Sequence, residues 1–138
     1  MSVFTPKEID YLTSQTLGRL ATVGRDGQPH VVPVSYRFNP DEDTIDIGGV
    51  DFGASKKWRD AHHTPRVTFL VDDASKTEAH AIEIRGEAEI HDTGGESINP
   101  RFPNFKPQYL RIRPRRIVSW WVNEPGPEPH GRDVAQGT

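Results

Sequence analysis

The sequence predicts a small, mainly β protein, a six-stranded barrel with two short helices. Glycine and proline each occur 12 times in 138 residues, a share typical of a turn-rich β protein. Valine and isoleucine together outnumber leucine by 20 to 5, and β-branched side chains favour strands. Residues 81–91 alternate between apolar side chains such as Ile82 and Ile84 and polar ones such as Glu83 and Arg85. That period of two predicts a strand with one buried face.

The predicted elements follow in chain order. Thr5 and Glu8 form a capping box around Pro6, which predicts a first helix that ends before Gly18. A second helix-compatible segment, residues 55–62, is stopped by Pro65. The six predicted strands are residues 19–23, 30–38, 44–48, 66–71, 81–91 and 109–122, the last one bent at Pro114.

The chain is predicted to hold one folded domain, residues 1–122. Residues 92–107 form a connection rich in Gly, Pro and Asn. Residues 123–138 carry three prolines, three glycines and few apolar side chains, so we expect a mobile C-terminal tail.

Composition excludes several classes of function. The net charge of −3 argues against a protein that coats nucleic acid or an anionic membrane. The lack of cysteine removes disulfides, zinc-thiolate sites and thiol nucleophiles. We expect no metal site either, because the adjacent His62 and His63 would point about 100° apart on a helix. With no apolar run of membrane-spanning length and no signal segment, we expect a cytoplasmic protein that binds neither membrane nor nucleic acid.

A candidate anion site lies at residues 55–57. Ser55, Lys56 and Lys57 start the second helix and follow the flexible pair Gly48-Gly49. A hydroxyl, helix-start amides and two ammonium groups can together hold a phosphate. The alternative is a solvated helix face, but cations at a helix N-terminus are unfavourable unless an anion is present, which favours the phosphate interpretation.

Four motifs in order resemble one family. Ser55-Lys56-Lys57, seven residues and then Pro65-Arg66-Val67 resemble the pyridoxamine 5'-phosphate oxidase-like (PPOX class) split-barrel flavoproteins. Residues 27–34 (GQPHVVPV), 17–23 (LGRLATV) and 43–49 (DTIDIGG) resemble its coenzyme F420-dependent oxidoreductase branch, in the group that includes a reductase of tetracycline biosynthesis. The resemblance covers residues 4–122.

The resemblance implies a six-stranded split β-barrel of the FMN-binding type, a homodimer with cofactor sites at the interface. Family members hold the cofactor ring along the second strand, the ribityl chain beside a glycine pair, and the phosphate at the Ser-Lys-Lys turn. Carried over, His30, Val31, Val32, Pro33, Val34 and Ser35 line the ring, Gly48, Gly49 and Val50 lie beside the ribityl chain, and Ser55, Lys56 and Lys57 take the phosphate. Pro33 fits independently, since a proline within a strand indicates an edge or a bulge.

The expected function is hydride transfer between coenzyme F420, a deazaflavin, and an electron-poor C=C or C=N bond of a small organic substrate. The FMN oxidases of the family carry an arginine where His30 stands, which favours F420 over FMN. An FMN-dependent flavoprotein and a non-catalytic carrier of F420, flavin or haem stay open as alternatives. No catalytic residue is identified; Tyr36 and His30 are proton-donor candidates by residue type alone.

Residues 111–116 hold four arginines, with Arg111, Arg113 and Arg115 on one face of the predicted strand. Two interpretations are open. The stripe could receive the oligoglutamate tail of F420. Alternatively, and with more weight, it pairs with Glu83, Glu87 and Glu89 of the preceding strand.

Overall fold

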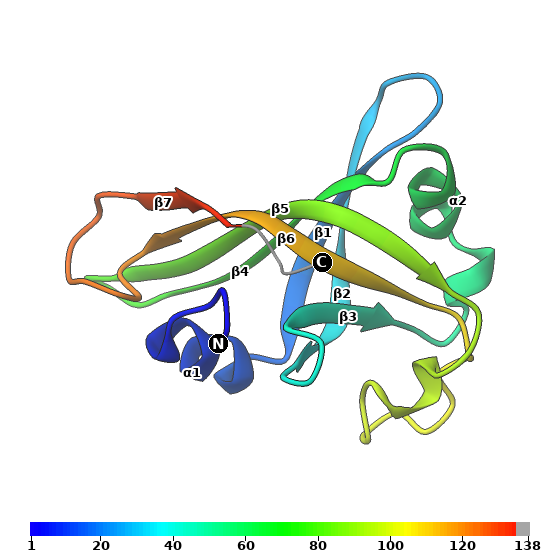
Figure 1. Ribbon diagram of the computed structural model, residues 1–138, viewed down its shortest axis with the longest axis horizontal. Coiled ribbons are helices and arrows are strands. Elements are labelled where there is room, and N and C mark those ends of the chain that lie inside the picture. The colour runs from blue at the N-terminus through cyan, green and yellow to red at the C-terminus, as the bar shows by residue number, and fades with distance from the viewer. Residues whose placement is uncertain (135–138) are drawn as a thin grey trace.

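The computed structural model describes residues 1–134 (Figure 1). The elements are α1 (Pro6–Ser14), β1 (Leu17–Val23), β2 (Pro29–Asn39), β3 (Thr44–Gly48), η1 (Phe52–Ala54), α2 (Lys56–His63), β4 (Arg66–Ala74), β5 (Ala79–His91), η2 (Gly95–Ser97), β6 (Tyr109–Trp120) and β7 (His130–Asp133). The sheet runs in the order β3-β2-β1-β4-β5-β6-β7 with antiparallel pairs, and β3 also pairs with β6. That last pairing closes six strands into a barrel and confirms the predicted split-barrel fold with two helices.

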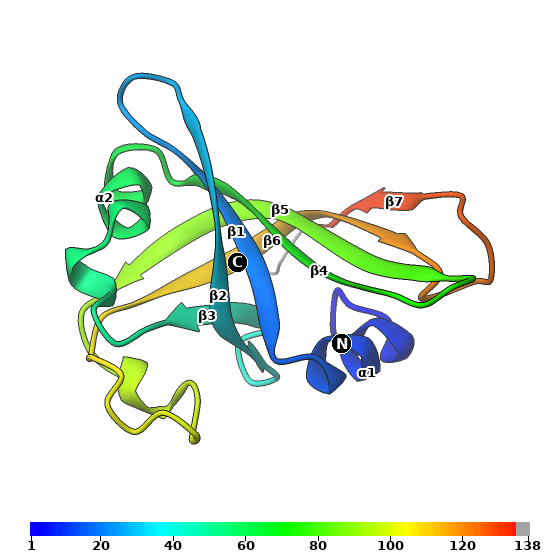
Figure 2. The same ribbon diagram turned by 180° about the vertical axis from the view of Figure 1, so that it is seen from behind.

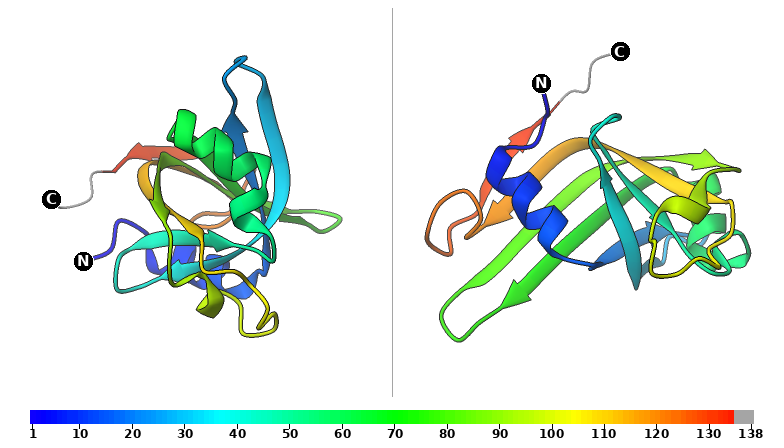
Figure 3. Two further views of the ribbon diagram at one scale, coloured as in Figure 1. Left: turned by 90° about the vertical axis from the view of Figure 1, so that its right-hand side faces the viewer. Right: turned by 90° about the horizontal axis from the view of Figure 1, so that it is seen from below.

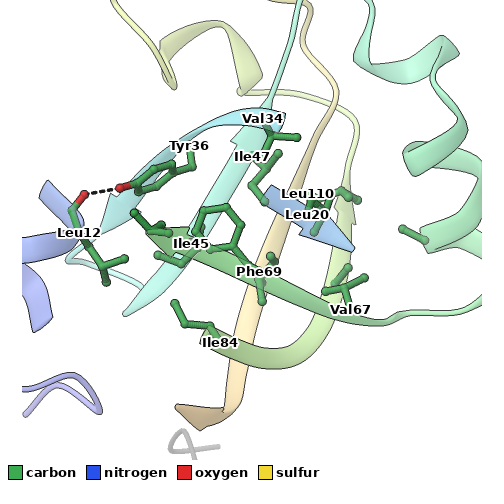
Figure 4. Close-up of a cluster of buried hydrophobic side chains, with 14 of the residues drawn as sticks. Leu12, Leu20, Val34, Tyr36, Ile45, Ile47, Val67, Phe69, Ile84 and Leu110 are labelled. Carbon is green, nitrogen blue, oxygen red and sulfur yellow. Dashed lines mark hydrogen bonds between the residues drawn. The ribbon is translucent and has the colours of Figure 1, made fainter. Parts of the chain in front are cut away.

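The barrel core follows from strand alternation. On β5, Ile82 and Ile84 are fully buried while Glu83 and Arg85 on the other face reach solvent. The inward side chains of the other strands meet them, as Figure 4 shows for Leu20, Val34, Ile45, Ile47, Val67, Phe69 and Leu110. Burial of these side chains is the main stabilising contribution to a barrel of this size.

Helix α1 closes one end of this core. The predicted capping box is present: the Thr5 side chain accepts from the Glu8 amide, and Glu8 accepts from the Thr5 amide. Leu12 points into the barrel and is fully buried. The buried hydroxyl of Tyr36 donates to the Leu12 carbonyl at 2.5 Å, which attaches the helix to β2 (Figure 4).

A β-bulge bends β5 and β6 where the sequence predicts a bend. Arg85 pairs with Arg116 and Gly86 pairs with Pro114, so Arg115 has no partner on β5. Proline has no amide hydrogen to give to the ladder, and a bulge accommodates that loss. A Cβ on Gly86 would lie only 2.2 Å from the Arg113 carbonyl oxygen, so the two strands approach more closely there than another residue would permit.

The C-terminal segment differs from the expected mobile tail. Residues 130–133 form β7, which pairs with residues 116–119 of β6. Arg132 donates twice to the fully buried Glu8 carboxylate, at 2.7 and 2.8 Å, and Asn123 donates to the same group at 2.8 Å. A buried carboxylate requires such partners, so these polar contacts order the segment together with Val122 and Val134, which pack against the barrel core. Residues 135–138 lie outside the described residues.

The two ends of the barrel are unlike. Helix α1 lies at one end, and α2, the end of β3 and the segment after β5 gather at the other (Figures 2 and 3). The β1–β2 hairpin projects beyond the sheet near α2 (Figure 1). Neither helix within residues 1–134 has the length and apolar character needed to cross a membrane.

Candidate functional site

A cavity of about 590 Å³ lies at the end of the barrel where β2, β3 and α2 meet. Such a volume suits a small-molecule or cofactor site. Its lining residues are Pro33, Val34, Ser35, Gly48, Gly49, Val50, Asp51, Phe52, Ala54, Ser55, Lys57, Phe102 and Phe105. Only Asp51 and Lys57 among them carry a titratable group, so the wall is mostly backbone and apolar side chain.

The structure brings together eight of the twelve residues that the sequence assigns to the cofactor. These are Pro33, Val34, Ser35, Gly48, Gly49, Val50, Ser55 and Lys57. The other four, His30, Val31, Val32 and Lys56, lie outside the cavity lining. The site is therefore formed by the middle of β2 rather than by its start.

The part of β2 that lines the cavity begins at an open edge. Residues 29–35 pair with β1, whereas pairing with β3 starts only at Ser35 opposite Gly48. Pro33 thus lies on a strand segment with one neighbour in residues 1–134, as its lack of an amide hydrogen predicts. Backbone groups on the free side can accept or donate hydrogen bonds to a planar ring.

Ser55 is the N-cap of α2. Its hydroxyl accepts from the Trp58 amide at 3.3 Å and donates to the Phe52 carbonyl at 2.6 Å. The hydroxyl therefore stabilises the tight turn between η1 and α2. The first two amides of α2, those of Lys56 and Lys57, have no acceptor within the helix and are available to an anion.

Lys57 supplies the cation of the cavity. Its ammonium lies 5.1 Å from the centroid of the Phe52 ring, and no carboxylate within residues 1–134 lies within 4.0 Å of it. Burial lowers the pKa of Lys57 because desolvation disfavours the charged form. A half-buried ammonium without a counter-charge is a strong attractor for an anionic ligand group.

Lys56, which the sequence also predicts at the phosphate, has an ion-pair partner on its own helix. Its ammonium donates to Asp60 at 3.0 Å, one turn along α2, and the nearly buried Asp60 also accepts from Thr22 at 2.9 Å. Burial by itself raises the pKa of Asp60, but the hydrogen bonds from Lys56 and Thr22 outweigh it and lower that pKa. The hydrogen bond between Thr22 and Asp60 attaches α2 to β1. Lys56 balances the charge of Asp60 in this contact, next to the cavity.

The two proton-donor candidates do not face the cavity. Tyr36 is buried beneath α1 with its hydroxyl on the Leu12 carbonyl, and burial raises its pKa. His30 lies near Asp60, where its charge contributes to lowering the pKa of that carboxyl. Neither side chain lines the cavity.

Sequence reasoning missed five lining residues: Asp51, Phe52, Ala54, Phe102 and Phe105. The first three belong to the η1 turn. The two phenylalanines come from the connection after β5, where apolar rings among Gly, Pro and Asn were the available signal. Gly48 gives room to Phe105 and its neighbour Ile98, since a Cβ there would lie 3.0 Å from Ile98 and 3.4 Å from Phe105.

The arginine stripe is paired within the chain. Arg111 donates to the fully buried Asp46 at 3.0 and 3.3 Å. Arg113 bonds Glu89 and Glu42, and Arg115 lies 3.8 Å from Glu87. The structure therefore supports the pairing interpretation. Asp46 and Glu42 are partners that the sequence did not indicate. Glu83, an expected partner, pairs with Arg85 instead.

The comparisons with known proteins agree with this fold. The profile of the pyridoxamine 5'-phosphate oxidase family matches residues 4–121. The chain is 42% identical over 135 residues, 95% of this chain and 93% of the other, to a protein of Streptomyces rimosus named 5a,11a-dehydrotetracycline/5a,11a-dehydrooxytetracycline reductase.

Two solved structures share the fold. A conserved hypothetical protein of Mycobacterium tuberculosis aligns with a TM-score of 0.68 at 24% identity, over 86% of each chain. General Stress Protein 26 of Bacillus anthracis aligns with a TM-score of 0.69 at 22% identity, over 93% of this chain and 96% of that one. With the family profile matched across nearly all of the barrel, the chain belongs to the pyridoxamine 5'-phosphate oxidase family.

Proposed function

We propose that this protein is an oxidoreductase that binds coenzyme F420 in the cavity and transfers a hydride between it and a small organic substrate, reducing an electron-poor C=C or C=N bond or forming that bond in the reverse direction. Membership of the family and the 42% identity to a named reductase support an oxidoreductase. The observation that carries the proposal is the unpaired, half-buried ammonium of Lys57 in a cavity formed by β2 and the start of α2.

The residues present fit a ring-and-phosphate cofactor. Lys57 and the first-turn amides of α2 can hold the phosphate, with Ser55 fixing the turn that presents them. The open edge of β2 near Pro33 and Val34 offers backbone groups to a ring. Gly48 and Gly49 line the adjacent wall and, having no side chains, leave space for the ligand.

The deazaflavin supplies the hydride chemistry when bound, and the chain supplies binding and orientation. Val34 and Phe52 exclude water from one side of the cavity, since both are buried. Lys57 fixes the anionic end, which sets the position of a ring along β2. No lining side chain is assigned as an acid, and we propose that solvent at the open mouth supplies the proton.

The proposal includes a homodimer with the cofactor sites at its interface. Val31 on the open edge of β2 is 67% exposed. An exposed apolar side chain beside an open strand edge is typical of a surface that a second subunit covers. The small organic substrate would then enter between the subunits.

FMN is the second candidate cofactor, because the resemblance of the sequence motifs to split-barrel flavoproteins implies a flavin-type cofactor and Lys57 would hold either phosphate. A non-catalytic carrier of F420, flavin or haem is the third possibility. Fluorescence titration with F420 and with FMN at matched salt separates the first two. We expect F420 to bind at least about tenfold more tightly, and equal or reversed affinities would contradict the F420 proposal.

Turnover separates the enzyme from the carrier. Reduced F420 should be oxidised by the protein in the presence of an acceptor such as dehydrotetracycline, monitored by the return of F420 absorbance. Stoichiometric binding without turnover on any conjugated acceptor would favour a carrier.

A further inference from the structure

The cavity has an exposed aromatic ring at its rim. Phe102 is 48% exposed and Val50 is 44% exposed, and both line the cavity. Leu17 is exposed to a similar extent, 46%, but lies outside the cavity lining. Exposed apolar side chains that gather at the rim of a hollow mark a binding surface more often than singly scattered ones do.

The Phe102 ring is held in place. It stacks on Phe105 with ring centroids 5.9 Å apart and planes 3° from parallel. Phe105 is itself buried, in a small cluster with Ile98 and Tyr109 that is separate from the barrel core. One face of Phe102 is thus occupied by a fixed ring.

The backbone around the two rings is also anchored. The Phe105 amide donates to the Phe102 carbonyl at 3.3 Å, and the Phe102 amide donates to the Asn99 carbonyl at 3.0 Å. The Lys106 amide donates to the Gly49 carbonyl at 3.1 Å, which joins the segment to the cavity wall. Because the ring is already ordered, little conformational entropy is lost when a ligand contacts it.

The cavity separates two kinds of contact. Lys57 and the α2 amides suit an anionic group, whereas Phe102 offers neither charge nor hydrogen bond, only a flat apolar face. Flat conjugated ligands stack on such faces with little preference for particular polar groups. A small aliphatic acceptor would gain much less from it.

We propose that Phe102 is a specificity-determining residue, which stacks on a flat, fused-ring conjugated substrate, and that Phe105 is the positioning residue that holds it. The inference rests on the proposed function only in taking the ligand at Phe102 to be the substrate rather than the cofactor. Through this stacking contact, Phe102 selects fused-ring compounds over single-ring or open-chain acceptors.

The test compares Phe102→Leu, Phe102→Trp and the control Leu17→Ala, which truncates an equally exposed apolar residue outside the cavity. The probe is tetracycline, a four-ring compound, titrated by its fluorescence into the protein with and without F420. We expect Phe102→Leu to raise the tetracycline Kd about tenfold, with Phe102→Trp within threefold and Leu17→Ala within twofold of the parent. The Kd for F420 should stay within twofold in Leu17→Ala, and Phe102→Leu should raise it less than it raises the tetracycline Kd.

A tetracycline Kd that Phe102→Leu leaves unchanged would overturn the proposal, as would a parent that does not bind tetracycline. Loss of F420 affinity in Phe102→Leu without loss of tetracycline affinity would make Phe102 a cofactor contact and overturn it too. Failure of the proposed function is separate: the parent would not bind F420, while the apo protein would still lose tetracycline affinity on Phe102→Leu. Leucine keeps the bulk of the side chain, and a cooperative melt of each variant confirms that it is folded.

Discussion

The ammonium of Lys56 donates to the buried carboxylate of Asp60 at 3.0 Å, one turn along the same helix. The ammonium of its neighbour Lys57 faces the cavity, 5.1 Å from the Phe52 ring centroid, with no ion-pair partner among residues 1–134. Two adjacent lysines thus differ in role: one compensates a charge inside the fold, and the other is free to compensate a charge on a ligand.

Lys57→Ala should weaken F420 binding strongly and change stability little. Removing the charged partner of a hydrogen-bonded anion costs about 1.5–3 kcal/mol, or about ten- to a hundredfold in Kd. Because Lys57 has no ion-pair partner to lose, the unfolding free energy should change by about 0.5 kcal/mol or less. Fluorescence titration and urea denaturation measure the two effects.

Lys56→Ala is the matched control and should behave in the opposite way. It leaves the buried Asp60 carboxylate with the hydrogen bond from Thr22 but without its ion-pair partner, which should cost about 1–3 kcal/mol of unfolding free energy. The Kd for F420 should stay within about threefold of the parent. If the two variants exchanged these effects, the assignment of the phosphate to Lys57 would be wrong.

This difference sets the limit of what the sequence predicts about the site. Spacing predicts the turn, the helix start and the middle of β2, because glycine, proline and capping residues act locally. The i,i+4 spacing of Lys56 and Asp60 is a local signal for their ion pair. The burial of that pair against Thr22 has no local signal, because Thr22 and Asp60 meet only when α2 packs on β1. Phe102 was missed for the same reason, because the strands that form the rest of the cavity wall lie far from it in the sequence.

Glu8 predicts a pH dependence of stability. Burial alone raises its pKa, but the hydrogen bonds from Arg132, Thr5 and Asn123 outweigh this and lower the pKa below its ordinary value of 4.5. A carboxyl whose pKa is lower in the folded than in the unfolded state stabilises the fold above the unfolded pKa. That contribution is lost as the pH falls through the folded-state pKa.

Glu8→Gln tests this dependence. The variant should lose about 1.5–3 kcal/mol of unfolding free energy at pH 7, where a charge-assisted pair with Arg132 is replaced by a neutral amide. The deficit relative to the parent should shrink as the pH is lowered from 5 to 3, followed by urea denaturation at each pH. A deficit that did not depend on pH would mean that packing, not charge, makes Glu8 important.

Gly86→Ala should be severely destabilising. The added Cβ would lie 2.2 Å from the Arg113 carbonyl oxygen, a backbone atom held by the β5–β6 ladder. Separating the strands at the bulge should cost about 3 kcal/mol. Gly49→Ala is the control, since its Cβ would make an ordinary 3.6 Å contact with Phe52, and it should change the unfolding free energy by less than about 1 kcal/mol.

The sequence predicts the fold better than it predicts the site, and strand β7 is the exception. All six barrel strands were predictable because alternation is a local signal, and Pro114 marked the bend. Strand β7 was not predictable, because residues 130–133 (HGRD) contain no apolar alternation. Its order depends on Arg132 reaching Glu8, more than a hundred residues earlier, and no local pattern carries that information.

Assembly is the last prediction. If the open edge of β2 and the exposed Val31 are covered by a second subunit, light scattering at micromolar concentration should give twice the 15.5 kDa chain mass, about 31 kDa. Val31→Asp should shift the protein toward the monomer, because a carboxylate buried at an apolar interface is strongly unfavourable. Since Val31 lies outside the cavity lining, any accompanying loss of F420 affinity would have to come from loss of the partner subunit. A parent mass of 15.5 kDa with tight F420 binding would instead show that one chain holds the cofactor alone.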